Sequence, residues 1–597
     1  MTPTSMLLSR RDLDFLLYDW LRADELTALP RFAAHSRQTF DAVLEVSAEL
    51  AEKQFRPHNR TGDLDEPTFD GQKVRTIPQV RAALDAFART GLIAGALDEE
   101  RGGIALPHLI HRACFAWFQA GNIATSSYPL LTMANVNLLL AYGSDAQVDT
   151  FVAPMLEGRY FGTMCLSEPE AGSSLADLTT RAVPDGQGRY RVTGRKMWIS
   201  GGDHDLSENI VHLVLARVQS APAGVKGLSL FVVPKHLVGA DGELGERNDV
   251  ALAGLNHKMG YRGITNTMLN FGEGAHTPGG EPGAIGYLIG EEGDGLKYMF
   301  HMMNEARIGV GAGAAALAYT GYLESLAYAR TRPQGRPVAD KDPASPQVLI
   351  TAHPDVRRML LASKSYAEGA MALVLYCAKL LDISQSGKDE TARAEAALLL
   401  DVLTPIAKSW PSQWGLVAND LAIQILGGAG YTRDHDVEQH YRDNRLNPIH
   451  EGTHGIHGLD LLGRKVIMDG GAGLDLLDGT IRRTLGAATD ELRPRAEQLE
   501  TRLDRLIAVT RKLWAAGDPE TALADSTAYL EATGHIVLAW IWLEQALAKA
   551  GREDRFHTGK RAAAHYFFTY ELPKVDPQLA LLENQDRLLL DLDPDCL

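Results

Sequence analysis

The residues best suited to chemistry in this chain lie at positions 449–457, where a glutamate stands among histidines. His450, Glu451 and His454 match the pattern H-E-x-x-H, in which two imidazoles one helical turn apart hold a zinc ion beside a carboxylate base. The same letters also frame a single catalytic carboxylate in a Glu-Gly-Thr turn. The two interpretations predict different proteins, because only the first requires a metal.

The composition of this segment argues against the zinc site. H-E-x-x-H binds a metal only when both histidines lie on one face of a regular helix. Gly452, Gly455 and Gly458 fall close together here, so the propensity of the segment to form a helix is low. The extended metalloprotease spacing also requires a histidine at 460, where this chain has Asp460. We therefore expect no metal at these residues.

The overall composition restricts the class of protein. A chain of 597 residues is too long for a single hydrophobic core, so we expect several domains. The formal net charge of -17 argues against a nucleic-acid partner. We find neither a signal-peptide core nor an apolar run long enough to span a membrane, and the four cysteines form no C-x-x-C pair. These features predict a cytoplasmic protein with no integral membrane contact.

The hydrophobic pattern divides the chain into four expected domains. An N-terminal α-helical domain covers residues 1–160, and a middle domain that forms an antiparallel β-barrel covers residues 161–280. A C-terminal α-helical bundle covers residues 281–470. An additional helical extension covers residues 471–597. The predicted fold class is therefore α+β and mainly α.

The elements follow from the spacing of apolar residues. Apolar residues at helical spacing predict helices, and short β-branched or aromatic runs between glycine, aspartate and proline predict strands. The predicted helices cover residues 40–55, 77–91, 107–141, 296–330, 354–381, 390–403, 410–426, 474–511 and 521–549. The predicted strands cover residues 190–193, 196–200, 211–218, 228–233 and 267–271.

Three glycine-containing segments allow two interpretations each. Residues 309–313 carry the spacing G-x-G-x-G, but a dinucleotide fingerprint needs a strand before it, and here the pattern is helical; close helix packing is favoured. Gly427 and Gly428 follow a helical pattern, either as its C-terminal cap or as backbone that lies close to a cofactor. Residues 166–174 form either a simple turn or a loop that contacts a ligand through small hydroxyl residues.

Several motifs, taken in their order along the chain, resemble the flavin-dependent acyl-CoA dehydrogenases. They are Met164-Cys-Leu-Ser-Glu-Pro, Lys196-Met-Trp-Ile-Ser, Arg307, Arg332-Pro-Gln-Gly-Arg-Pro, Gln424-Ile-Leu-Gly-Gly, Arg442-Asp443 and Ile449-His-Glu-Gly-Thr. The resemblance covers about residues 30–470 and includes the order of helices, barrel and helices. The helices after residue 470 resemble a long subgroup of this family, which includes 3-methylthiopropanoyl-CoA dehydrogenase and bacterial fatty acyl-CoA dehydrogenases.

The resemblance implies a reaction and a base. An FAD enzyme would convert a saturated acyl-CoA to a trans-2-enoyl-CoA, with the α-proton going to Glu451, the β-hydride to flavin N5, and the electrons on to an electron-transfer flavoprotein. A glutamate suits this task because the exclusion of water raises its basicity. The thioester oxygen would be polarised by the backbone N–H of Glu451 and a ribityl hydroxyl of the flavin.

The resemblance also implies binding residues. The cofactor positions are Met164, Leu166, Ser167, Trp198, Ser200, Arg332, Gln424, Gly427, Gly428, Thr453 and Gly455. The substrate positions are Ser173, Asn304, Arg307 and Gly452. Arg332, Gln424, Gly427 and Gly428 resemble elements that reach the FAD pyrophosphate and adenosine of a neighbouring subunit. Because the extra helices would cover the surface through which smaller relatives form tetramers, we expect a homodimer. The chain departs from the family at His450, where a tyrosine is common, at Asn304, where an aspartate is common, and at Gly455, which has no side chain for a polar contact.

Three alternatives share parts of this site. An acyl-CoA oxidase would carry out the same first half-reaction and pass the electrons to oxygen. A flavin monooxygenase on the same fold is disfavoured by the intact base at Glu451. A non-catalytic protein that binds acyl-CoA or flavin would need neither the base nor an electron acceptor. The sequence does not predict the acyl chain length.

Overall fold

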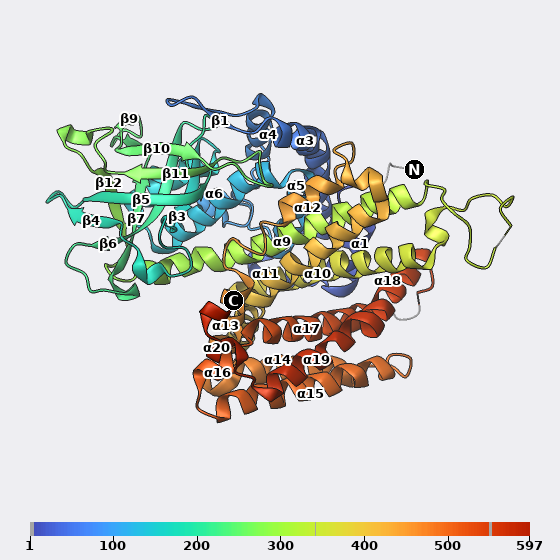
Figure 1. Cartoon of the computed structure of the whole chain (residues 1–597). Helices are drawn as coiled ribbons and strands as arrows, with labels where there is room; N and C mark the ends of the chain where they lie inside the picture. The colour runs from blue at the N-terminus through green and yellow to red at the C-terminus, as the bar shows by residue number, and fades with distance from the viewer. Residues whose placement is uncertain (1–4, 341, 549–551) are drawn as a thin grey trace. The chain divides into compact units, whose positions relative to one another are not determined.

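The computed structural model describes residues 5–340, 342–548 and 552–597, and these are mainly helical with one β domain (Figure 1). The chain divides into two compact units. The first unit consists of Met1–Glu45, Pro107–Ala120 and Arg307–Leu597, and the second of Val46–Leu106 and Gly121–Ala306. The predicted α+β class, mainly α, is confirmed. Among the described helices, none combines the length and apolar character needed to cross a membrane.

The β domain of the second unit is a barrel that closes through five strands. β5 (Tyr190–Ser200) pairs with β12 (Ala284–Ile289), β12 with β7 (Leu228–Pro234), and β7 with β6 (Asn209–Val218). β4 (Arg181–Pro184) completes the ring, because it pairs with both β6 and β5. A closed ring leaves no free strand edge between these five strands.

The expectation that the barrel is antiparallel is wrong for two pairs of strands. β3 (Tyr160–Cys165) and β4 both run parallel to β6. Parallel neighbours cannot be joined by a tight hairpin, and β4 and β5 lie in the chain between β3 and β6. The edge beyond β5 is antiparallel, with β11 (Asn266–Phe271) followed by β10 (Val250–Leu255).

Strand β6 is buried on both faces, which explains its nearly continuous apolar sequence. Val214 and Ala216 pack into the core inside the barrel, whereas Leu213 and Leu215 pack into a second core. That second core includes residues of α6 (Ile123–Tyr142). Successive side chains of a strand point to opposite faces, so one strand can serve two cores.

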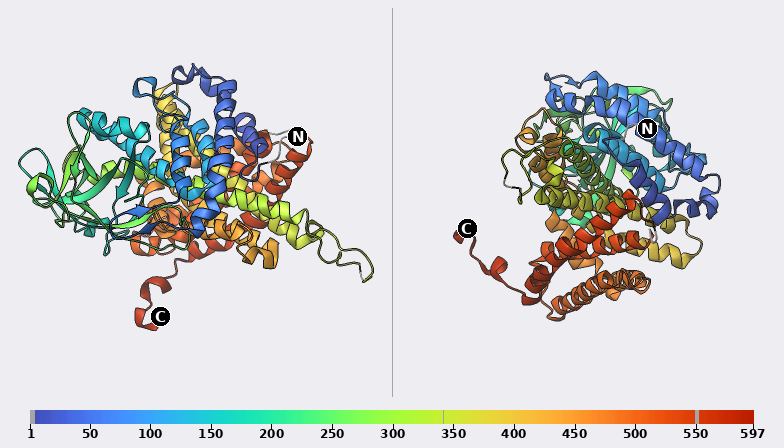
Figure 2. Two further views of the ribbon diagram at one scale, coloured as in Figure 1. Left: turned by 90° about the horizontal axis from the view of Figure 1, so that it is seen from above. Right: turned by 90° about the vertical axis from the view of Figure 1, so that its right-hand side faces the viewer.

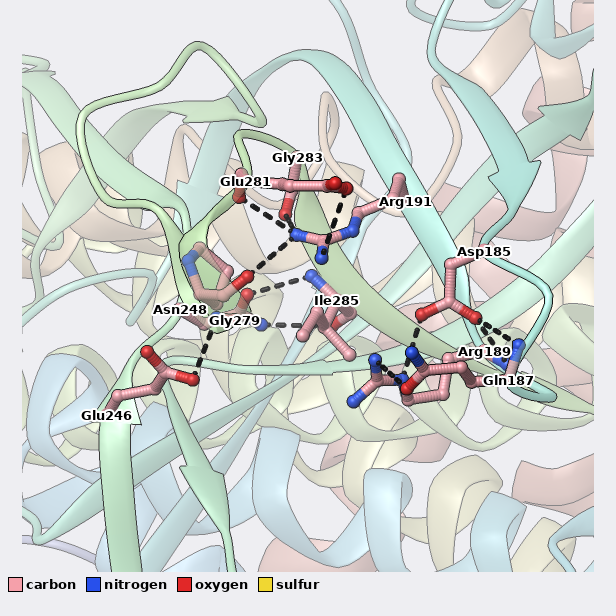
Figure 3. A network of polar contacts seen from close by, with 11 residues as sticks. Asp185, Gln187, Arg189, Arg191, Glu246, Asn248, Gly279, Glu281, Gly283 and Ile285 are labelled. Atoms are coloured by element: carbon pink, nitrogen blue, oxygen red, sulfur yellow. Dashed lines mark hydrogen bonds and ion pairs between the residues drawn. The ribbon is translucent and has the colours of Figure 1, made fainter.

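Polar side chains fix the loops around the barrel (Figure 3). Arg191 on β5 donates from Nη1 to the carbonyl oxygens of Pro278, Glu281 and Gly283 at 3.0, 3.0 and 3.1 Å. Asn248 donates to the carbonyl of Ile285 at 2.9 Å and accepts from its N–H at 2.8 Å. The Arg191 bonds tie the loop before β12 to β5, and the Asn248 bonds tie β12 to the segment before β10.

The second unit also contains short helices and two small antiparallel strand pairs. The helices include η4 (Ala51–Phe55), α3 (Asn59–Leu64), α4 (Pro78–Ala88) and α8 (Ala153–Leu156), and the strand pairs are β1 (Thr68–Phe69) with β2 (Val74–Arg75) and β8 (His236–Val238) with β9 (Leu244–Arg247). Helix α6 lies against β3, and Asn135 of α6 donates to the carbonyl of Val211 on β6 at 3.1 Å. Gly162 on β3 permits this contact, since a Cβ there would lie 2.5 Å from the Asn135 Cβ.

The first unit is built on long helices. α9 (Gly295–Ala329) packs closely on α11 (Glu390–Leu426), since a Cβ on Gly311 would lie 2.0 Å from the carbonyl oxygen of Ala407. This confirms close helix packing at Gly311. α10 (Pro354–Ser386) lies beside α11, and α5 (His108–Gly121) is capped by Asp382, which accepts from His108 N–H at 2.7 Å.

Helix α11 differs from the prediction. The sequence predicted two helices that end and restart near Pro405 and Pro411, because proline lacks an N–H and clashes with the preceding turn. The structure has one continuous helix that contains both prolines. Both prolines are buried, so packing on neighbouring helices stabilises a helix that local propensity would interrupt.

The C-terminal extension is helical, and its helices lie side by side (Figure 1). They are α14 (Ala472–Gly486), α15 (Arg493–Ala515), α17 (Ser526–Ala548), α18 (Arg555–Tyr566) and α19 (Val575–Asn584). The single helix predicted over 474–511 is therefore two helices. In both views of Figure 2, the segment after α19 extends away from these helices.

A buried ion cluster joins the extension to the N-terminal residues. Lys560 on α18 contacts Asp12, and its Nζ lies 2.9 Å from the carboxylate of Glu368 on α10. Tyr319 on α9 donates to Asp12 at 2.9 Å. Lys364 also contacts Glu368, so two lysines balance two carboxylates, as buried charges require.

Candidate active site

Glu451 lies in a turn between α12 (Val437–Asn444) and α13 (His454–Asp460). Its backbone has φ +54°, a left-handed conformation, and Gly452 follows with φ +95°. Thr453 then caps α13, because its side chain accepts from the N–H of Ile456 at 3.4 Å. A non-glycine residue with positive φ is uncommon and is often found where function constrains the backbone.

The helix that an H-E-x-x-H zinc site requires is not present. His450 lies in the turn before Glu451, while His454 begins α13. The two imidazoles also have different partners: His450 Nε2 lies 3.0 Å from Oδ1 of Asn447, and His454 Nδ1 contacts Ser409. Burial, followed by the charge of Lys408, lowers the pKa of His450 to about 3 and that of His454 to about 4, so both are neutral near pH 7.

The charges of two cationic side chains act on the Glu451 carboxylate. Burial raises the pKa of Glu451, and the charges of Arg307 and Lys408 act in the opposite direction. Arg307 on α9 is buried, and its Nη1 lies 3.4 Å from a carboxylate oxygen of Asp460. Lys408 on α11 is also buried, with a pKa that burial lowers to about 7. The net effect leaves Glu451 a stronger base than an exposed glutamate.

The carbonyl groups of the turn have donors. Lys408 Nζ donates to the carbonyl of Asn447 at 2.7 Å and to that of Gly452 at 2.5 Å. His457 Nε2 lies 3.1 Å from the carbonyl oxygen of Glu451, which fits the tautomer protonated on Nε2. The turn is therefore held by hydrogen bonds on both sides of the glutamate.

The structure groups some of the expected residues of the first unit around Glu451 and places others at the far end of α11. Gly452, Thr453 and Gly455 belong to the turn and the start of α13. Gln424 lies on the last turn of α11, roughly 24 Å along the helix from Lys408, and Gly427 and Gly428 follow the helix. Arg332 is exposed beyond the end of α9.

At the end of α11, Gly427 is the C-cap, and its N–H bonds to the carbonyls of Ile423 and Gln424, as one of the two interpretations predicted. Its φ is +62° and its ψ −135°, a positive φ that suits glycine but lies outside the αL region. Among the described residues, apart from the adjacent ones, no atom lies within 4 Å of a Cβ built on Gly427 or Gly428. The backbone here is therefore accessible, which leaves the cofactor interpretation available.

In the second unit, strand β5 and the loop after β3 lie side by side. Ser167 accepts from the N–H of Met197 at 2.9 Å, and Lys196 donates to the carbonyl of Leu166 at 2.9 Å. Ser200 accepts from Asn266 at 3.3 Å. The structure thus brings Leu166, Ser167 and the strand that carries Trp198 and Ser200 together.

Trp198 is presented by an irregularity in β5. The pairing of β5 with β11 shifts by one residue between Lys196 and Ile199, which is a β-bulge. Trp198 lies in this bulge with φ +64°, and its side chain is 58% exposed. Bulges often redirect a side chain next to a functional site, and here the bulge exposes a large flat indole.

Three further expected residues also lie in the second unit. Met164 is partly buried on β3, Ser173 is exposed in the loop that follows Glu168, and Asn304 is partly buried on α9. The side chains of Ser173 and Asn304 come from different elements, so the sequence motifs alone could not relate them.

Sequence reasoning missed an ion pair under this loop. Glu168 accepts from the Thr179 and Thr180 hydroxyls at 2.6 Å each, and Lys196 Nζ lies 3.0 Å from its carboxylate. Burial acts to raise the pKa of Glu168, but Lys196 and the two threonines lower it to about 2. Glu168 belongs to the motif Met164-Cys-Leu-Ser-Glu-Pro and Lys196 to the motif Lys196-Met-Trp-Ile-Ser. The charge of Lys196 within a predicted strand was the available signal.

Lys408, Ser409, Asn447, His457 and Asp460 were likewise missed as partners of the base turn. They come from α11, the turn itself and α13. The available signal was the pair of charges at positions 401 and 408 within an apolar helical pattern. A charged residue in a helical pattern usually lies on a face that is exposed to solvent, and only the fold shows that Lys408 is buried.

Three family models match the chain in order. Residues 163–273 match the acyl-CoA dehydrogenase middle domain, and residues 293–466 match the acyl-CoA dehydrogenase C-terminal domain. Residues 476–593 match a domain described as acetyl-CoA dehydrogenase C-terminal like.

Whole proteins match over nearly the full length. The 3-methylmercaptopropionyl-CoA dehydrogenase of Ruegeria pomeroyi is 36% identical over 575 residues, which is 93% of this chain and 94% of that protein. The fold also resembles Caenorhabditis elegans ACDH-11 in complex with C11-CoA, with TM-score 0.77, 20% identity, and 95% and 93% of the two chains covered. An acyl-CoA dehydrogenase from Bacillus anthracis complexed with FAD gives TM-score 0.73, 17% identity, and 97% and 95% coverage. The chain therefore belongs to the acyl-CoA dehydrogenase family, with the extra C-terminal domain, and is an oxidoreductase that acts on CH–CH groups.

Proposed function

We propose that this enzyme uses FAD to convert a saturated acyl-CoA to a trans-2-enoyl-CoA, with Glu451 as the base. The observation that carries the proposal is the Glu451 turn, where a glutamate with raised pKa has a left-handed backbone and is acted on by the charges of the buried Arg307 and Lys408. A relative that covers the same length is named 3-methylmercaptopropionyl-CoA dehydrogenase, which supports an acyl-CoA substrate.

The residues present fit FAD. The exposed indole of Trp198 offers a flat face for an isoalloxazine ring, with Ser167 and Ser200 as polar neighbours. The open backbone at Gly427 and Gly428 would let a dinucleotide approach closely. When bound, FAD supplies the acceptor for the hydride that leaves the β-carbon of the substrate.

Arg332 and Gln424 would hold the dinucleotide end of FAD in a neighbouring subunit. Arg332 can bind phosphate oxygens through two parallel N–H groups. Lys408 contacts the base turn, and Gln424 lies roughly 24 Å from it along α11. This separation favours a contact of Gln424 with the FAD of the neighbouring subunit and not with the FAD beside Glu451 of its own subunit. The homodimer that we propose rests on this separation and on the family pattern.

Glu451 would remove the α-proton of the thioester. Its raised pKa makes the carboxylate a better proton acceptor, and its turn fixes the direction of the side chain. Within the described residues, the backbone N–H of Glu451 has no hydrogen-bond acceptor. That N–H is therefore suited to polarise the thioester oxygen as negative charge develops.

Four residues would hold the CoA thioester and its pantetheine arm: Ser173, Asn304, Arg307 and Gly452. Ser173 is exposed, and Gly452 belongs to the base turn itself. A side chain at Gly452 would lie 2.8 Å from the His457 ring, so only the backbone can make this contact. The electron acceptor that we propose is an electron-transfer flavoprotein, on the family pattern.

The first prediction tests the base. In Glu451→Gln, the amide cannot accept a proton, so anaerobic bleaching of the flavin by acyl-CoA is expected to slow by roughly 10³-fold. The variant should keep its FAD and its yellow colour, because the substitution changes no expected FAD contact. A stopped-flow measurement of the absorbance of the oxidised flavin would follow the reaction.

A matched control is Glu438→Gln, which alters a partly buried carboxylate of α12 that pairs with Arg442 at 2.6 Å. It should reduce the flavin nearly as fast as the parent enzyme. If Glu451→Gln also does so, Glu451 is not the base. A panel of acyl-CoAs that includes methylthiopropanoyl-CoA would identify the substrate, and peroxide formed in air would indicate an oxidase instead.

A further inference from the structure

Lys408 lies in an unusual place for a lysine. It stands on α11 between Pro405 and Pro411, and its exposed fraction is 0%. A buried ammonium group is costly unless it is hydrogen-bonded or paired with a negative charge. The contacts of Lys408 go to main-chain oxygens, those of Asn447 and Gly452. Among the residues described, no carboxylate lies within ion-pair distance of its Nζ.

These two carbonyls stand on either side of Glu451. The carbonyl of Asn447 precedes the glutamate and that of Gly452 follows it, so one ammonium group bridges the two sides of the turn. Left-handed conformations of a non-glycine residue cost about 1 kcal/mol or more and persist only where the surroundings fix them. Lys408 donates two of the hydrogen bonds that stabilise the left-handed conformation of Glu451.

The charge of Lys408 also acts on the carboxylate. Among the groups that shift the pKa of Glu451, burial raises it, and Arg307 and Lys408 lower it. The charge of Arg307 is partly offset by Asp460, because Nη1 of Arg307 lies 3.4 Å from a carboxylate oxygen of Asp460. Lys408 has no such carboxylate partner, so its charge is not offset locally and Glu451 is the carboxylate that raises its pKa.

We propose that Lys408 is a positioning residue for the base: its ammonium group holds the carbonyls of Asn447 and Gly452 and keeps the Glu451 carboxylate ionised before the substrate reacts. The inference rests on the proposed function, since it assigns Lys408 a role only if Glu451 takes the proton. It extends that function by naming what maintains the base in its reactive form.

Other titratable groups around the pair are neutral or already paired. His450, His454 and His457 have pKa values that burial lowers well below neutrality, so they carry no charge near pH 7. Arg307 on α9 is charged throughout. Asp460, Arg464 and Asp401 act on the pKa of Arg307, and Arg445 acts on the pKa of His454. A change in pH between 5 and 8 therefore acts mainly on Glu451 and Lys408.

The test compares Lys408→Met with Lys408→Arg in the FAD-loaded enzyme. Met removes the charge and the donors, so the pKa of Glu451 should rise further and the acid limb of the kcat profile should move up by roughly one pH unit. At pH values below the parent's acid limb, kcat should fall by roughly tenfold, and KM should change little. Arg keeps the charge and the donors, so it should restore the acid limb and most of kcat.

Lys465→Met is the matched control. Lys465 is also buried, but it pairs with Asp401 and does not act on the pKa of Glu451. This variant should lose thermal stability and keep the parent's acid limb. If Lys408→Met behaves in the same way, or if Lys408→Arg fails to restore the acid limb, the inference is wrong. If Lys408→Met does not fold, Lys408→Gln replaces it with the same expected shift.

A second measurement does not depend on turnover. The thermal unfolding of Lys408→Met, Glu451→Gln and the double variant forms a double-mutant cycle, and the double variant should lose less stability than the sum of the two single losses. Additive losses would contradict the charge coupling. Failure of the proposed function looks different: Glu451→Gln would then still bleach flavin rapidly, whatever the variants of Lys408 do.

Discussion

Two of the predicted functional residues, Trp198 and Glu451, hold left-handed backbone conformations although neither is a glycine. Each is fixed by its neighbours: Trp198 by the bulge between β5 and β11, and Glu451 by hydrogen bonds to the turn. Strain of this kind is maintained when the direction of a side chain matters more than the local conformational energy. The same two residues were predicted as flavin contact and base from sequence motifs alone.

The residues that support them could not be predicted in the same way. Glu168 and Lys196 stand in separate motifs, and their pairing depends on how the loop after β3 folds against β5. Lys408 is a lone charge in an apolar helix, and nothing in its sequence neighbourhood indicates which carbonyls it meets. Hydrophobic patterning locates faces of elements, whereas polar contacts depend on tertiary structure.

The buried pair under the Trp198 loop leads to a prediction about stability. Glu168→Gln removes the carboxylate and leaves the buried Lys196 ammonium without a counter-charge, which should lower the free energy of unfolding by about 3 kcal/mol. Glu170→Gln, an exposed change in the same loop, should alter it by less than about 0.5 kcal/mol. Chemical denaturation measures both, and equal effects of the two variants would contradict the assignment.

The same carboxylate has a pH signature. The folded-state pKa of Glu168 is about 2, below its usual 4.5, so its contribution to stability is present above pH 4.5 and is lost as the pH falls toward 2. The difference in stability between the parent and Glu168→Gln should therefore shrink over that window. Unfolding curves at pH 5, 4 and 3 would follow it, and a difference that stays constant would exclude the pairing as its cause.

At the scale of elements, the extension packs directly on the helix that follows the base. A Cβ on Gly458 of α13 would lie 2.6 Å from the carbonyl oxygen of Ser526 and 3.0 Å from the N–H nitrogen of Thr527. These contacts are with the main chain at the start of α17, which cannot move aside as a flexible side chain can. The absence of a side chain at Gly458 is thus a condition for the contact between α13 and α17.

Gly458→Ala should therefore separate the two helices and lower the free energy of unfolding by about 2 kcal/mol. It should also slow flavin bleaching, because α13 begins next to the base turn. Gly479→Ala on α14 is the matched control, since its Cβ would meet only the Arg483 side chain at 3.9 Å. That change should stabilise the protein slightly, by about 0.5 kcal/mol. A neutral Gly458→Ala would contradict the packing.

Element prediction succeeded where periodicity was long and failed where packing overrode local preference. The helices α4, α10 and α17 lie close to their predicted ranges. α11 runs through two prolines that the prediction treated as ends, and the helix predicted over 474–511 is interrupted between α14 and α15. The parallel pairing of β3 with β6 was missed because pairing partners are not encoded in the pattern of either strand.

At the scale of the whole molecule, the four-domain division over residues 1–160, 161–280, 281–470 and 471–597 stays a prediction. The homodimer is a second prediction at this scale. Light scattering of the FAD-loaded enzyme should give twice the chain mass of 65.0 kDa. The physical reason is that Arg332 and Gln424 lie away from the base turn and would serve a second copy's cofactor. A stable tetramer or a fully active monomer would contradict it.

The contact of Gly458 with Ser526 also bears on how the protein is made. The ribosome synthesises α13 well before α17, so the close contact of Gly458 with the main chain of Ser526 cannot form until the extension has emerged. Lys408 and His457, which hydrogen-bond to the base turn, are made earlier. We therefore expect ribosome-bound chains that end before Ser526 to lack the packing of α13 on α17, which hydrogen exchange in α13 would detect.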